Sequence, residues 1–105
     1  MSGQHTPGPW LWLGTEGTIA MIVDEDGYSI ARVTVTENST AHHALQANLR
    51  LMTASPDLLD ALLDALPYVE DVLSDPEQLA CFKPGVVERH ASAIRAAIER
   101  ATGGQ

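Results

Sequence analysis

The chain has a single cysteine, Cys81, among its 105 residues. A lone cysteine cannot form an intrachain disulfide, which excludes the disulfide-stabilised class of small secreted domains and fits a reducing cytoplasm. We therefore expect the chain to be stabilised by an apolar core and not by covalent cross-links.

Basic residues are also scarce. Six Lys and Arg stand against fourteen Asp and Glu, which gives a formal net charge of −8. A protein that binds the backbone of a nucleic acid needs a basic surface, so this composition argues against direct nucleic-acid binding. The excess of acid favours solubility and a partner with a basic surface.

Long apolar runs are missing as well. No segment approaches the roughly 20 apolar residues of a membrane-spanning helix, and the first residues lack the charged start and apolar stretch of a secretion signal. We therefore expect a cytoplasmic protein with no membrane partner. The length predicts a single domain over residues 1–105 with a modest core, which a homo-oligomer would help to cover.

The sequence contains no pattern typical of an enzyme. It has no Gly-x-Ser-x-Gly nucleophile motif and no glycine loop that opens a helix and holds phosphate. His42 and His43 are adjacent and would point in different directions, so they do not suggest a shared metal ion. We predict a protein without catalytic residues, bound cofactor or metal site.

The first third of the chain predicts a small β-sheet. Short β-branched and apolar runs between about residues 10 and 36 are separated by glycine-containing turns. Three such strands joined by short turns form an antiparallel meander with one face free for helices. In the third strand, Ala31, Val33 and Val35 would face one side.

The remaining sequence predicts about three helices, at 40–53, 56–74 and 85–101, which together with the meander define an α+β fold. Pro67 lies inside the second helix, where it predicts a kink or a break. In the third helix the predicted inward-facing residues are Val87, Ala91, Ile94, Ala97 and Ile98.

The corner between the first two helices is marked by Ser55 and Pro56. Ser55 is expected to cap the second helix through its hydroxyl, and Pro56 to occupy the first helical position. A dense leucine face follows at helical spacing and is expected to face the core. It consists of Leu58, Leu59, Leu62, Leu63 and Leu66.

Asn48 lies among the apolar positions of the first helix, between Leu45 and Met52. Because a buried amide needs hydrogen-bond partners, we expect its side chain to bind backbone groups of the sheet or of the Pro7–Trp10 turn. Asn48, Ser55 and Pro56 are therefore assigned structural roles.

The second helix is strongly acidic. Seven acids and no base occur between Asp57 and Glu77. These acids form either a solvated face or a surface that meets a basic partner. The candidate partner-binding residues are Asp60, Asp64, Glu70 and Asp71.

Two segments resemble a family of small proteins encoded by bacteriophages and prophages. The first is His5-Thr6-Pro7-Gly8-Pro9-Trp10, similar to an HTPGPW-type opening. The second, Ala47–Leu62, is similar to an NARLIAAAPELLEAL-type segment, although Leu49, Met52, Thr53 and Ser55 depart from it. The resemblance covers about residues 5–66 and implies a phage accessory protein, with no catalytic residues to carry over.

Two functions are compatible with these features. In the first, a non-enzymatic phage accessory protein binds and modulates a host protein, such as a defence component, through the acidic face. In the second, a homo-oligomer sequesters a small nucleotide immune signal. That pocket would draw on an aromatic platform and on basic groups, and the candidate residues are Trp10, Tyr28, Arg89, His90 and Arg95.

Overall fold

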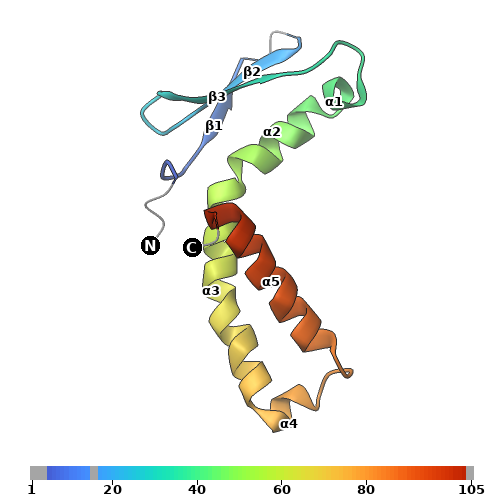
Figure 1. Cartoon of the computed structure of the whole chain (residues 1–105). Coiled ribbons are helices and arrows are strands. Elements are labelled where there is room, and N and C mark those ends of the chain that lie inside the picture. The colour runs from blue at the N-terminus through green and yellow to red at the C-terminus, as the bar shows by residue number, and fades with distance from the viewer. Residues whose placement is uncertain (1–4, 15–16, 104–105) are drawn as a thin grey trace. The chain divides into compact units, whose positions relative to one another are not determined.

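A computed structural model describes residues 5–14 and 17–103. It consists of two compact units that divide after Asp57, and each unit is described by itself (Figure 1). The first unit contains a sheet and two short helices, and the second is helical. The predicted α+β class is confirmed.

The first unit contains the predicted three-stranded meander. Strands β1 (Leu11–Leu13), β2 (Ile19–Val23) and β3 (Ser29–Thr34) form one antiparallel sheet in the order β1-β2-β3 (Figure 1). The turn before β3 is organised by Asp24, whose carboxylate accepts hydrogen bonds from the backbone N–H groups of Asp26 (3.0 Å) and Tyr28 (2.8 Å). An Asp side chain that binds backbone donors in this way stabilises a tight turn.

The core of this unit forms where one face of the sheet meets the helix that follows it. Ile22 lies opposite Trp12 on β1 and opposite Ala31 on β3, as expected for side chains that share one face of a sheet. Ala20, Ile22, Leu45 and Leu49 are buried together. The partly buried residues around them are Trp10, Trp12, Ile30, Ala31, Val33 and Val35.

The predicted helix at 40–53 is two helices, α1 (Thr40–His43) and α2 (Leu45–Thr53). The interruption is at Ala44, whose φ of −99° and ψ of 10° depart from helical values. Ser39 caps α1, since its hydroxyl accepts a hydrogen bond from the N–H of His42 at 3.1 Å.

The predicted role of Ser55 as a helix cap is wrong. Helix α3 (Ser55–Ser74) already includes Ser55, and the Ser55 hydroxyl donates to the carbonyl oxygen of Leu51 at 3.1 Å. The reason is that Ala54 keeps a right-handed helical conformation, with φ −81° and ψ −7°. A serine in helical backbone can then bind the carbonyl four residues earlier. Pro56 falls in the first turn of α3, where its missing N–H costs no hydrogen bond.

The predicted hydrogen bonds of Asn48 are also not found. Its side chain is half-buried on α2, and among the described residues its amide makes no hydrogen bond to the sheet or to the Pro7–Trp10 turn. The core side of α2 is occupied by the fully buried Leu49, so Asn48 lies at the margin of the core and its amide is not enclosed.

The two segments that carry the phage-family resemblance contact each other. A Cβ atom added at Gly8 would lie 3.2 Å from the Cβ of Pro56, so only a residue without a side chain fits there comfortably. Trp10 is fixed beside this contact, because its indole N–H donates to the carbonyl of Thr6 at 3.0 Å. Trp10 also packs against the core cluster, where it is partly buried.

The second unit is a helical hairpin. Helices α3 and α5 (Val86–Thr102) are connected through the short helix α4 (Pro76–Leu79), which Asp75 caps (Figure 1). The helix continues through Pro67, so of the predicted kink or break, the break does not occur. Gly85 precedes α5 with a φ of 82°, a conformation that favours glycine.

The inward-facing rows of the hairpin have coiled-coil spacing. On α5, Val87 and Ala91 are buried, and Ile94, Ala97 and Ile98 are half-buried, as predicted. On α3, Leu59 is buried and the half-buried residues of the same row are Leu62, Leu66, Val69 and Leu73. Positions spaced by three and four residues lie on one face of a helix, which explains this row.

Two of the five leucines predicted to face the core do not do so. Leu58 is 48% exposed and Leu63 is 40% exposed. The five leucines cover too wide an arc of α3, because consecutive residues are turned by about 100° and one partner helix covers only part of the circumference.

We predict that residues 1–105 unfold as one domain, because α3 begins before the division at Asp57 and continues past it. Both tryptophans lie in the first unit, so their fluorescence reports on the sheet, whereas the far-ultraviolet circular dichroism reports mainly on α3 and α5. Urea transitions followed by the two signals are expected to coincide. Two separate midpoints would contradict the single-domain prediction.

Candidate functional surfaces

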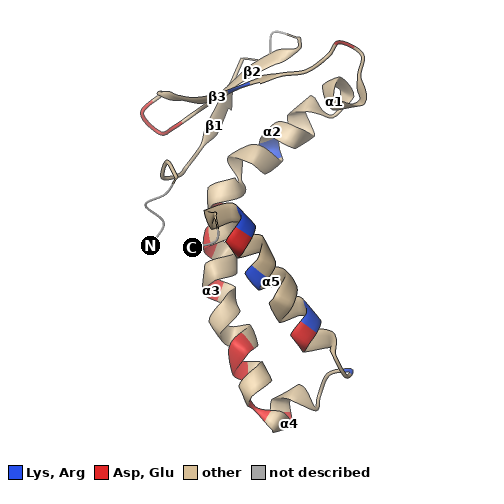
Figure 2. Ribbon diagram, viewed as in Figure 1, with Lys and Arg blue, Asp and Glu red and all other residues tan. Residues whose placement is uncertain are grey.

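The acidic surface of the second unit is a row along one side of α3. Asp60, Asp64 and Asp71 are all exposed. They are four and seven residues apart, which places their carboxylates on the same face of the helix. Figure 2 shows that the charged residues of α3 and α4 are acidic, whereas α5 carries charged residues of both signs. We call Asp60, Asp64 and Asp71 the acidic row.

Glu70, the fourth predicted acid, is not part of this row. Its carboxylate accepts hydrogen bonds from Arg95 of α5, at 3.0 Å from Nη2 and 3.3 Å from Nε. Glu70 follows Leu59 by eleven residues, or about three turns, so it lies on the hairpin side of α3. Both side chains remain nearly half exposed, and such a pair contributes about 0–1 kcal/mol to stability.

The residues proposed for a nucleotide pocket have separate environments. In the first unit, Trp10 binds Thr6 and packs on the core, while Tyr28 is 73% exposed. In the second unit, Arg95 is paired with Glu70. His90 lines an apolar groove that neither Arg89 nor Arg95 lines.

That groove is a feature that the sequence analysis missed. It has a volume of about 310 Å³ and lies between α3 and α5 near the α4 end of the hairpin. Phe82, which borders it, is 49% exposed. The lining residues are Tyr68, Val69, Val72, Phe82, Val86, Val87 and His90.

The groove lies on a second apolar face of the hairpin, beside the inward-facing rows. We call its residues the outer rows, one on each helix. A second three-and-four spacing in the sequence could have revealed them. The outer row of α3 contains Leu58, Ala61, Ala65, Tyr68 and Val72, and that of α5 contains Val86, His90, Ala93 and Ala97, the last of which lies where the inward-facing and outer rows of α5 adjoin.

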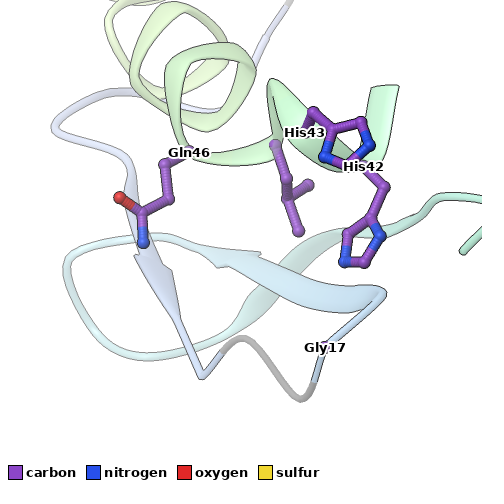
Figure 3. A pocket seen from close by; sticks show the side chains of 5 residues that line it. Gly17, His42, His43 and Gln46 are labelled. Carbon is purple, nitrogen blue, oxygen red and sulfur yellow. The ribbon is translucent and has the colours of Figure 1, made fainter. Parts of the chain in front are cut away.

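The first unit has a cavity of its own, of about 280 Å³, lined by Gly17, His42, His43, Leu45 and Gln46 (Figure 3). The imidazole rings of His42 and His43 are stacked, with centroids 5.9 Å apart, so the expectation that they point in different directions is wrong. The interruption at Ala44 follows them directly, and α1 ends at His43. Nδ1 of His42 accepts a hydrogen bond from the N–H of Asn38 at 2.9 Å.

Among residues 5–14 and 17–103, no helix combines the length and apolar character that a membrane crossing requires. The fold and the surfaces therefore define a small acidic α+β protein with an acidic helical row and an apolar helical face that borders a groove.

The chain belongs to the family of Salmonella phage P22 protein Y8K6, whose family model matches residues 1–105. The predicted membership of a phage protein family is confirmed, over a longer part of the chain than the two motifs cover. The comparisons found no match among curated proteins and none among solved structures. No activity is assigned to this family.

Proposed function

We propose that the chain is a non-enzymatic phage accessory protein that binds a basic surface of a host protein through the acidic row of α3. The observation that supports this proposal is the placement of Asp60, Asp64 and Asp71. All three are exposed on one helix face, and no ion pair or hydrogen bond of their side chains is found among the described residues.

Unpaired carboxylates on a rigid helix suit recognition of a basic surface. Their fixed spacing along α3 gives a row of charge that a complementary set of Lys and Arg side chains can match, and such matching raises the rate and specificity of association. The net charge of −8 adds a long-range attraction toward a basic partner. Glu70 is excluded from the proposed contact because Arg95 already neutralises it.

The nucleotide-binding alternative gains no comparable support. The groove that includes His90 is lined mainly by apolar side chains, and neither Arg89 nor Arg95 lines it. A nucleotide phosphate requires free cationic groups or aligned N–H donors.

The proposal is tested by reversing the charge of two of the three residues of the acidic row, in the variant Asp60→Lys with Asp64→Lys. The protein and the variant are used to capture partners from a host lysate, and a captured protein is then purified for titration over a range of salt concentrations. We expect affinity for that partner to fall at least about tenfold in the variant, and to fall with salt for the parent protein.

A matched control carries the same change in charge elsewhere, as Glu25→Lys with Glu37→Lys, two exposed acids of the first unit. The control should bind like the parent protein. Equal losses in both variants would show that only net charge matters, and the absence of any partner that distinguishes the variant from the control would overturn the proposal.

A further inference from the structure

The outer rows of α3 and α5 form an apolar face that the hairpin does not cover. Leu58 is 48% exposed and Tyr68 is 74% exposed on this face. The groove at its α4 end is bordered by Phe82, also half exposed. Exposed apolar side chains grouped along two adjacent helices, beside a groove, are typical of an interaction surface.

The two edges of this face carry opposite charges. On α3, Asp64 and Asp71 each immediately precede an outer-row residue, Ala65 and Val72, so they lie along the outer edge of that row. These positions correspond to those that flank the apolar seam of a coiled coil, where charge selects the partner helix.

On α5 the charge at the corresponding edge is positive. Arg89 immediately precedes the outer-row residue His90, and Arg100 follows Ala97 by three residues. Both arginines are exposed and, unlike Arg95, make no ion pair among the described residues. The face is thus acidic along the α3 edge and basic along the α5 edge.

The charges also match along the length of the hairpin. Val72 of α3 and His90 of α5 line the same groove, so their neighbours Asp71 and Arg89 lie at the same end. Arg100 is eleven residues beyond Arg89, and Asp64 is seven residues before Asp71. With a rise of about 1.5 Å per residue, Arg100 and Asp64 lie within about one helical turn of the same level.

We propose that this face binds a second copy of the chain, in a four-helix bundle whose two-fold axis runs parallel to α3 and α5. That axis places α3 of one subunit against α5 of the other, so that Asp71 faces the partner subunit's Arg89. The alternative two-fold axis, perpendicular to the helices, would place α3 against α3 and bring acid opposite acid. Charge complementarity therefore selects the first arrangement.

The size of the face is sufficient for such a dimer. A surface two helices wide and about 25 Å long provides roughly 500 Å² on each subunit, or about 1,000 Å² in total, which is the size of a weak, reversible interface. Knobs-into-holes packing of three-and-four rows is the usual way in which two hairpins form a bundle. This inference goes beyond the proposed function, and because it uses Asp64 and Asp71 of the same acidic row, a second copy of the chain would compete with a host protein for that row.

The experiment is sedimentation equilibrium of the full chain over a concentration series up to millimolar. We expect a monomer–dimer equilibrium that weakens roughly tenfold in Asp71→Arg and in Arg89→Asp. The double variant Asp71→Arg with Arg89→Asp should restore association, because each new arginine again faces an aspartate across the two-fold axis. Asp26→Arg, an exposed change in the first unit, serves as the control and should associate like the parent.

A second variant, Tyr68→Glu, places charge in the middle of the outer row and should leave a monomer with unchanged circular dichroism, since Tyr68 is mostly exposed in one chain. A parent protein that stays monomeric at millimolar concentration would overturn the proposal. If Tyr68→Glu did not weaken the dimer, the proposed face would be wrong. If the double variant Asp71→Arg with Arg89→Asp did not restore the association that each single variant weakens, the proposed orientation of the two subunits would be wrong.

Discussion

Replacing Leu49 by alanine is expected to lower the free energy of unfolding of the first unit by about 2–5 kcal/mol. Leu49 is fully buried between α2 and the sheet, in the cluster that also contains Ala20, Ile22 and Leu45. Truncation removes apolar contacts and leaves a cavity that the short strands can close only in part. The measurement is urea unfolding followed by tryptophan fluorescence, because Trp10 and Trp12 pack against this cluster.

Leu51→Ala is the matched control for this substitution. Leu51 is on the same helix, two residues away, but is 63% exposed. The identical chemical change there should alter stability by no more than about 0.5 kcal/mol. Equal losses at the two positions would show that the core does not lie where α2 meets the sheet.

Replacing Ala91 by glutamate is expected to destabilise the hairpin by about 3 kcal/mol or more. Ala91 is fully buried on the inward face of α5, and a carboxylate there would lose its hydration without gaining a partner. Glutamate is itself a good helix former, so the loss would report on burial and not on helix propensity. Hydrogen exchange of the amides of α5, together with circular dichroism, measures the effect.

Ser92→Glu provides the control, with the same introduced charge at the adjacent, exposed position. In the Ser92→Glu variant, the amides of α5 should be nearly as protected from hydrogen exchange as in the parent protein. If Ala91→Glu were tolerated equally well, the inward face assigned to α5 would be wrong.

The strands and the long helices follow from local patterns that the chain carries explicitly. Ala31, Val33 and Val35 alternate with exposed residues in and just after β3, and the three-and-four spacing from Val87 to Ile98 identifies the buried face of α5. These periods of two and of 3.6 residues arise from backbone geometry, so they can be recognised without knowing what the side chains contact.

Two of the errors, at Ser55 and at the His42–His43 pair, concern residues with more than one favourable local state. Ser55 can cap a helix or bind the carbonyl of Leu51, and the conformation of Ala54 selects the second. His42 and His43 were expected to diverge, but the end of α1 at His43 leaves their rings stacked over one cavity. Such choices depend on small differences in backbone angle that composition does not specify.

The candidate surfaces also depend partly on local spacing, which the sequence reveals, and partly on tertiary contacts, which it does not. The acidic character of α3 follows from residue types and spacing, since Asp60, Asp64 and Asp71 must share a face of any helix that contains them. The tertiary contact with Arg95 was needed to remove Glu70 from that set. The exposure of Leu58 and Tyr68 likewise depends on which part of α3 is covered by α5.

Residue order alone therefore established the α+β class, the position of the meander, the apolar periodicity of the helices and the resemblance to a phage family. Packing settled which of two apolar rows on α3 is buried and which acid is neutralised. The physical reason is that periodicity is a property of one helix or strand, whereas burial and ion pairing depend on a second element, whose distance and direction are set by the fold.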